Sequence, residues 1–242
     1  MDREEVEKMS KKRNAAVAKV DRDRTYAPDE ALGLVKEIAS ASFDETVEAA
    51  FMLGIDAKQA DQAVRGTVSL PHGTGKSVRV VAFAEGDEAK AAEEAGADLV
   101  GAADLVAAIE SGTQALDWDV TIAHPSLMAE VGKLGRSLGP RGLMPNPKAG
   151  TVTQDVGKVV AEFKAGRVEY RNDRYGNVHV AIGKVSFTPH QLTENLSELV
   201  AELNRARSSS VKGRYIRRLT VSSTMGVGVP VDVGALEDLE SE

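Results

Sequence analysis

The chain has 242 residues and a net charge of −7, and it contains no cysteine. The absence of cysteine excludes disulfides and metal or iron–sulfur sites with thiolate ligands. No apolar run approaches the roughly 18 residues that span a bilayer, and residues 1–8 are too polar for a secretory signal. We therefore expect a cytoplasmic protein with no membrane partner.

The first third of the chain predicts two helices and several strands. Residues 1–24 are highly charged, which is typical of a solvated helix or a mobile arm. A proline, acids in the next turn and apolar residues spaced by three or four predict a helix over residues 28–38. Alternation of apolar and other residues predicts a strand over 43–53. Two further strands are predicted around a turn within 66–84.

Helix and strand patterns alternate through the middle of the chain. Apolar spacing predicts helices over residues 87–95, 102–110 and 125–134, with strand-like segments at 96–100 and 120–123. Such alternation is typical of a three-layer α/β domain with a mainly parallel sheet.

The last third predicts a helix over 156–165, strands within 166–185, an amphipathic helix over 189–207 and a strand over 215–223. The helix and strand patterns at the two chain ends favour one domain built from both ends, with an α/β domain inserted between them. We therefore predict a two-domain fold of the α/β and α+β classes. Its domains are residues 1–68 with 160–242, and residues 69–159.

The segment 135–148 is rich in glycine and proline and shows no helix or strand period. Each proline sets its own φ and each glycine permits unusual conformations, so we predict a rigid, irregular loop. Such a loop is either a hinge between domains or a surface shaped around a partner. Its only charges are Arg136, Arg141 and Lys148.

Positive charge gathers toward the C-terminal end. Residues 161–231 carry 11 basic and 6 acidic side chains, and no acid lies between Glu202 and Asp232. A local basic face binds anions even on an acidic protein; a solvated helix end and loop is the alternative. The cations of this stretch are Arg205, Arg207, Lys212, Arg214, Arg217 and Arg218.

The sequence contains no catalytic or metal-binding constellation. Residues 73–77 resemble the end of a phosphate-binding loop, but Leu70 replaces the required glycine and a strand follows, so we interpret them as a tight turn. The four histidines lack metal-ligand spacing, and no Gly-x-Ser-x-Gly elbow with a following acid and histidine occurs. We expect no cofactor, no metal and no catalytic residue.

Small hydroxyl residues, a methionine and glycines follow the last predicted strand, at 222–230. Serine and threonine can donate to phosphate or ribose, and glycine lets a ligand approach the backbone. A plain turn after a core strand is the alternative.

Four motifs, in this order, resemble the bacterial type of the large-subunit ribosomal protein L-one family. They are FDETVE at 43–48, VRGTVSLPHGTGK at 64–76, GRSLGPRGLMPNPK at 135–148 and TMG at 224–226. The resemblance extends over roughly residues 10–233. It implies a split β-α-β domain made of both chain ends and an inserted Rossmann-like domain.

The resemblance also implies a function. Members of the family are structural proteins, not enzymes, and bind large-subunit rRNA at the mobile stalk beside the tRNA exit site. The resemblance implies help with release of deacylated tRNA, and repression of the protein's own mRNA through an rRNA-like leader. It further implies a monomer off the ribosome.

Carried over by motif, the RNA face uses an aromatic surface, hydroxyls, one phosphate-facing lysine and a methionine and glycine that allow close approach. The implied residues are Phe43, Thr46, His179, Lys184, Ser222, Thr224, Met225 and Gly226. The cations of the 135–148 loop, Arg136, Arg141 and Lys148, are expected to add secondary RNA contacts or to line the interdomain cleft.

Two features depart from the family pattern. Ser42 precedes Phe43, where family members usually carry a basic residue, and the chain is acidic where bacterial members are usually basic. We expect the additional acids to lie in the inserted domain and at the chain ends, away from the RNA face.

The alternative function is that of an enzyme whose inserted domain binds a nucleotide or another phosphate ligand at its strand ends. No complete glycine fingerprint supports it, and analogy of fold alone is a weak argument for function.

Overall fold

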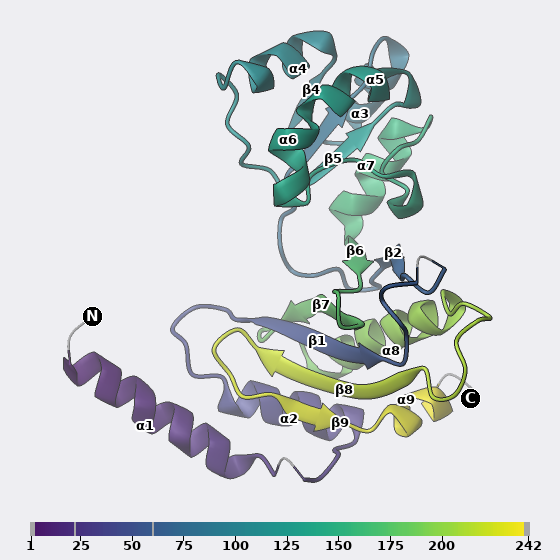
Figure 1. The fold of residues 1–242 in the computed structure, drawn as a ribbon. Helices are drawn as coiled ribbons and strands as arrows, with labels where there is room; N and C mark the ends of the chain where they lie inside the picture. The colour runs from purple at the N-terminus through teal and green to yellow at the C-terminus, as the bar shows by residue number, and fades with distance from the viewer. Residues whose placement is uncertain (1–2, 22, 60, 240–242) are drawn as a thin grey trace. The chain divides into compact units, whose positions relative to one another are not determined.

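The computed structural model describes residues 3–21, 23–59 and 61–239, and Figure 1 shows the fold as a ribbon. Residues 1, 2 and 22 of the predicted N-terminal helix or arm lie outside the described residues. Two compact units divide the chain. Unit 1 comprises residues 1–64, 70–75 and 170–242, and unit 2 comprises residues 65–69 and 76–169. None of the described helices has the length and apolar character needed to cross a membrane.

Within its described residues, unit 1 contains four helices and four complete strands. The helices are α1 (Arg3–Lys19), α2 (Pro28–Ile38), α8 (Pro189–Arg205) and α9 (Val233–Leu239), and the strands are β1 (Thr46–Leu53), β7 (Asn177–Lys184), β8 (Ile216–Ser223) and β9 (Val229–Val231). The strands form one sheet in the order β7-β1-β8-β9, and neighbouring strands are antiparallel.

Helices α2 and α8 pack against each other and cover one face of this sheet (Figure 1). The alternation of β1 directs Val47, Ala49 and Phe51 into this core, where all three side chains are buried. Helix α8 presents a stripe of buried leucines to the sheet. Its start is defined by a capping box, in which the Thr188 and Gln191 side chains each bond to the other residue's backbone N–H.

Unit 2 has a parallel sheet with helices on both faces. The strands of this sheet are β3 (Val80–Phe83), β4 (Leu99–Gly101) and β5 (Val120–Ala123), and the longer helices are α3 (Asp87–Glu94), α4 (Ala103–Glu110) and α7 (Val156–Ala165). The sheet order is β4-β3-β5. Val80 and Ala82 face a core that includes Phe163 of α7, whereas Val81 and Phe83 face α4. The predicted α/β fold class is confirmed.

The predicted irregular loop at 135–148 is partly wrong. Short helical turns run through it: α6 (Gly135–Leu138), η3 (Gly139–Arg141) and η4 (Pro147–Ala149). Before it, the single helix predicted over 125–134 is broken into η1 (Pro125–Leu127), α5 (Met128–Val131) and η2 (Gly132–Leu134). Leu138 and Leu143 are buried in the core beside α4, and this burial holds the segment in place. The glycine and proline content concealed the two core leucines.

The prediction of two strands around a turn within 66–84 is also wrong in its pairing. Strand β2 (Arg65–Ser69) pairs with β6 (Arg167–Arg171), whereas β3 joins the parallel sheet of unit 2. The intervening residues 70–75 belong to unit 1, where buried Asn195 of α8 binds them.

The boundaries of the units differ from the predicted domain boundaries near α7. Residues 160–169 belong to unit 2, because α7 packs against α3 and β3 with Phe163 in the shared core. Lys164 Nζ also donates to the carbonyl of Val78 (2.8 Å) and to Asp98 (2.6 Å) in the same unit.

Candidate nucleic-acid interface

The sheet of unit 1 has one face that α2 and α8 do not cover, which we call the open face. Alternate residues of three strands point to it because successive side chains of a strand point to opposite sides. The open face comprises Thr46, Glu48, Ala50 and Met52 of β1, Asn177, His179, Ala181 and Lys184 of β7, and Arg218, Thr220 and Ser222 of β8. All of them are exposed or half-buried. Most of these side chains are small or polar, so few large side chains protrude from the sheet and a ligand can approach it closely.

Three chain segments that are distant in sequence meet at one end of the open face. Since β1 is antiparallel to both neighbours, its first residue lies beside the last residues of β7 and β8, and Thr46 is opposite Lys184. Lys184 Nζ donates to Thr46 Oγ1 at 2.8 Å. The Thr46 N–H donates to Thr224 Oγ1 at 3.0 Å, and this hydroxyl donates to the Thr46 carbonyl at 3.3 Å.

Two large apolar side chains next to this meeting point are exposed to solvent. Phe43 is 56% exposed and Met225 is 49% exposed. Met225 lies in a tight turn in which the Gly226 N–H donates to the Ser223 carbonyl at 3.0 Å. We call Phe43, Thr46, Lys184, Thr224, Met225 and Gly226 together the Thr46 end. Exposed aromatic and thioether groups beside a lysine and hydroxyls suit stacking on a base together with contact to a phosphate.

The prediction that Phe43 belongs to the first strand is wrong, because β1 begins only at Thr46. The preceding residues are held by side-chain bonds instead of a ladder. Asp44 accepts hydrogen bonds from the backbone N–H (3.0 Å) and the hydroxyl (2.7 Å) of Ser186. Phe43 therefore stands free of the sheet.

Glu45 holds the Thr46 end together, and sequence reasoning did not select it as a functional residue. It is 2% exposed, and its carboxylate accepts hydrogen bonds from the N–H groups of Ala41 (2.9 Å) and Met225 (2.8 Å), with Ser40 as a third donor. The available signal was an acid directly before β1, at a position in phase with the buried residues Val47 and Ala49 of that strand. Such a buried carboxylate needs internal donors.

Glu45 makes the stability of unit 1 dependent on pH. Burial by itself raises the pKa of this carboxyl, but hydrogen bonds from Met225, Ala41 and other groups outweigh burial and lower the pKa below its ordinary value of 4.5. A lowered pKa in the folded state stabilises the fold at pH values above 4.5, and this contribution is lost as the pH falls through the folded-state pKa. We expect the difference in unfolding free energy between the native chain and Glu45→Gln to shrink from pH 7 to pH values below about 4.5. Urea unfolding at each pH measures this free-energy difference. A difference that stays constant with pH would contradict a lowered pKa of Glu45.

His179 and Ser222 lie on the open face but outside the Thr46 end. Ser222 is opposite Glu48, and His179 is opposite Ala50, which is four residues along β1 from Thr46. At about 3.4 Å per residue, His179 lies roughly 14 Å along the sheet from Thr46. These two residues would extend a contact surface along the strands instead of joining the hydrogen-bonded group.

The expectation that acids avoid this face is wrong. Glu48 is exposed in its centre, and Asp44 and Glu45 lie beside the Thr46 end. Asp44 and Glu45 use their carboxylates in hydrogen bonds to the protein. Glu48 forms no hydrogen bond or ion pair with any residue that the structure describes.

The three cations of the 135–148 segment lie in unit 2 and are exposed. Arg136 is in α6 and Lys148 is in η4. Arg141 is partly committed to the protein, because its Nη1 donates to the carbonyl of Leu116 at 2.9 Å.

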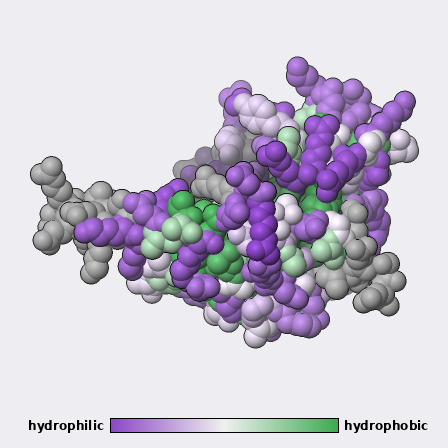
Figure 2. Space-filling model, turned by 90° about the horizontal axis from the view of Figure 1, so that it is seen from below, coloured by the Kyte–Doolittle hydropathy of each residue, from purple (hydrophilic) through white to green (hydrophobic). Residues whose placement is uncertain are grey.

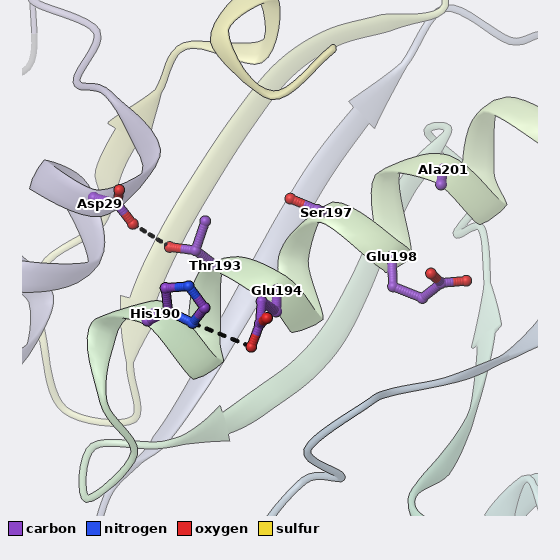
Figure 3. A pocket seen from close by; sticks show the side chains of 7 residues that line it. All are labelled: Asp29, His190, Thr193, Glu194, Ser197, Glu198 and Ala201. Carbon is purple, nitrogen blue, oxygen red and sulfur yellow. Dashed lines mark hydrogen bonds and ion pairs between the residues drawn. The ribbon is translucent and has the colours of Figure 1, made fainter. Parts of the chain in front are cut away.

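A hollow elsewhere on unit 1 does not suit an anion (Figure 3). It is lined by Asp29 of α2 and by Glu194 and Glu198 of α8, whose carboxylates repel phosphate. Thr193 donates to Asp29 at 2.6 Å, and His190 lies 3.2 Å from Glu194.

Figure 2 shows a face on which hydrophilic side chains predominate and hydrophobic ones form small patches.

Comparison with known proteins decides the family. The model of the ribosomal protein L1p/L10e family matches residues 35–227, a range that contains β1, the turn at Met225 and all of unit 2. The chain belongs to the ribosomal protein L1p/L10e family.

Relatives in this family match nearly the whole chain. The large ribosomal subunit protein uL1 of Cutibacterium acnes is 55% identical over 96% of this chain and 100% of its own length. The uL1 proteins of Streptomyces griseus and Chloroflexus aggregans are each 55% identical over 96% of this chain, and over 96% and 99% of their own lengths.

The predicted resemblance is confirmed by these matches. As an L1p/L10e family member, the chain is a structural, rRNA-binding constituent of the large ribosomal subunit and not an enzyme. Its predicted location, on the ribosome, follows from the same membership. The alternative of a nucleotide-binding enzyme is set aside.

Proposed function

We propose that unit 1 binds the stalk region of large-subunit rRNA through the open face, with the Thr46 end as the centre of the contact. The observation that supports this is the direct hydrogen bonding of Thr46, Lys184 and Thr224 beside exposed Phe43 and Met225. The group is built from three segments far apart in the chain, so the folded sheet presents it ready-made. A preorganised surface binds with a smaller loss of conformational entropy.

Each side chain of the Thr46 end has a distinct proposed role. Lys184 supplies a charge to a phosphate, and Thr46 and Thr224 offer hydroxyls to sugar or phosphate. Phe43 and Met225 lie against bases or sugars. Gly226 keeps the turn open: a Cβ there would lie 2.4 Å from Ser223 Oγ, so a larger residue would disturb the turn. His179 and Ser222 extend the contact along the sheet.

The test is binding of the purified protein to a stalk-region rRNA fragment and to an unrelated hairpin of equal length across a salt series. We expect tight binding to the stalk fragment that persists at moderate salt, because shape and hydrogen bonds add to the charge contribution. Equal and salt-sensitive binding to both RNAs would mean that only general charge attraction operates, and the proposed site would be withdrawn.

Replacing Lys184 with alanine is expected to weaken stalk binding and to reduce the slope of log affinity against log salt by about one, since one phosphate contact is lost. Fluorescence anisotropy across the salt series measures the slope. Lys58→Ala removes the same charge from an exposed position outside the open face, and its slope should match that of the native chain. Equal slopes for the native chain and Lys184→Ala would contradict a phosphate contact at Lys184.

The finer parts of the family function are proposals for this chain as well. We propose that it assists release of deacylated tRNA at the exit site and represses its own mRNA by binding an rRNA-like leader. The support is that one preformed surface can bind two RNAs of the same shape. Competition between the stalk fragment and the leader for one protein molecule tests the second proposal, and simultaneous binding of both would contradict it.

Two further proposals concern assembly and unit 2. The chain is proposed to be a monomer off the ribosome, which sedimentation would test by its mass. Arg136 and Lys148 are proposed as secondary RNA contacts because both are exposed cations on ordered helical turns. Arg141 is proposed to contribute less, since its guanidinium already donates to the protein.

A further inference from the structure

Glu48 is an exposed carboxylate in the middle of the open face. It lies two residues after Thr46 on the same side of β1, roughly 7 Å along the strand, and it is opposite Ala181 on one side and Ser222 on the other. No residue within the described part of the chain donates a hydrogen bond to it or pairs with it as a cation. The charged member of the Thr46 end, Lys184, bonds instead to the Thr46 hydroxyl.

A carboxylate at this place weakens RNA binding unless the RNA itself supplies donors. Phosphates repel it, and an ionised carboxylate can only accept hydrogen bonds. The hydrogen-bond donors of RNA are the 2′-hydroxyls and the N–H groups on base edges. Guanine carries an N2 amino group next to its N1–H, so its Watson–Crick edge can donate to both oxygens of one carboxylate.

The neighbours of Glu48 leave room for a base. Ala50 and Ala181 have the smallest side chains that still bear a Cβ, and Ser222 adds a hydroxyl that can donate or accept. A base that approaches Glu48 would therefore meet a low surface. The next residue outward on this face, Thr46, belongs to the group that is proposed to hold the backbone of the RNA.

We propose that Glu48 is a specificity-determining residue that reads a guanine of the bound RNA by accepting hydrogen bonds from its N2 amino group and N1–H. This inference rests on the proposed rRNA contact of the open face. Glu48 would determine which base is bound, whereas Lys184 would attract the RNA through its charge. The two side chains would therefore contribute to specificity and to affinity, respectively.

The sign of the effect of Glu48→Gln separates this role from simple repulsion. A glutamine keeps the size of the side chain but replaces one acceptor oxygen with a donor amide and removes the charge. If Glu48 reads a guanine, Glu48→Gln weakens binding to the stalk fragment by about 5-fold or more, the range expected for a lost two-bond base contact. Binding to the unrelated hairpin stays equal or becomes tighter, because a negative charge is gone.

Inosine substitution identifies the base. Inosine lacks the N2 amino group of guanosine, so replacing the guanines of the stalk fragment one at a time should weaken binding of the native chain about 5-fold or more at one position. The same substitution should leave binding by Glu48→Gln almost unchanged. Glu198→Gln removes one charge from α8, on the other side of the sheet, and should keep both the affinity and the inosine sensitivity of the native chain.

Three outcomes would overturn the inference. Tighter binding of all RNAs by Glu48→Gln would show a merely repulsive acid. An equal inosine effect in the native chain and in Glu48→Gln would show that another residue reads that guanine, and the absence of any inosine effect would exclude reading of an N2 amino group. Failure of the native chain to prefer the stalk fragment over the hairpin is a separate result, which would withdraw the proposed rRNA contact and this inference together.

Discussion

Replacing Gly183 with alanine is expected to destabilise unit 1 by about 3 kcal/mol, from overpacking together with backbone strain. The residue has φ of +155°, a conformation that residues with a Cβ rarely adopt. A Cβ at this position would lie 2.6 Å from Leu192 Cδ2 and 2.9 Å from Phe187 Cδ2. Leu192 is fully buried, so it cannot move aside without opening the core between the sheet and α8.

Gly183 lies at an irregularity of β7 that also positions Lys184 of the proposed RNA site. Val47 pairs with Gly183 and Glu48 with Ala181, so Ile182 is an additional residue in the strand. Such a bulge changes the direction of the residues that follow it, and Lys184 follows directly. We therefore expect Gly183→Ala to weaken stalk binding as well.

Urea unfolding measures the loss, and Gly33→Ala is the matched control. Gly33 is inside α2, and nothing lies within 4 Å of the position that its Cβ would take. Alanine there should stabilise the helix by about 0.5–1 kcal/mol, since glycine costs conformational entropy in a helix. A loss of less than about 1 kcal/mol for Gly183→Ala would show that the bulge adapts easily.

The second large effect is expected for Asn195→Ala, also about 3 kcal/mol of lost stability, because buried polar groups lose their partners. Asn195 is fully buried on the sheet-facing side of α8. Its Nδ2 donates to the carbonyls of Gly73 (2.9 Å) and Ile182 (2.7 Å), and its Oδ1 accepts from the His72 N–H (3.0 Å). One side-chain amide therefore bonds to the carbonyl at the bulge of β7 and also holds residues 70–75 against α8.

Thr193→Ala on the same helix is the control for Asn195→Ala. Thr193 makes one exposed hydrogen bond, to Asp29 (Figure 3). Loss of this bond should change the free energy of unfolding by no more than about 0.5 kcal/mol. Thermal unfolding of both variants provides the comparison. Similar values for the two would mean that the buried bonds of Asn195 contribute little beyond those of a surface pair.

Local periodicity was sufficient for most of the helices and strands. The apolar spacing of residues 28–38 and 189–207 and the alternation of β1 depend only on which residues face a core. The structure confirms these elements, with α8 ending two residues early, at Arg205. The secondary-structure prediction failed where the local sequence pattern was compatible with two conformations. Residues 135–148 look irregular by composition, but burial of Leu138 and Leu143 makes helical turns the better solution.

The residues of the candidate site came from the motif resemblance, and their arrangement came from the fold. Glycine, hydroxyl residues and a methionine at 222–230 are compatible with a plain turn, so the pattern alone did not choose between a turn and a ligand site. Glu45 and Asn195 were missed because their role is to satisfy donors and acceptors from distant segments. Only the pairing of those segments identifies such partners.

The sequence by itself determined the family of this protein, the class of its fold and the amphipathic elements, because these depend on motif order and on the local spacing of apolar residues. The tertiary structure decided that Lys184 and Thr224 both hydrogen-bond to Thr46, and that Phe43 lies outside the strand. It also decided that Glu48 lies on the open face with no hydrogen bond or ion pair to any described residue. These features depend on antiparallel register and on a bulge, which bring together residues more than 100 positions apart.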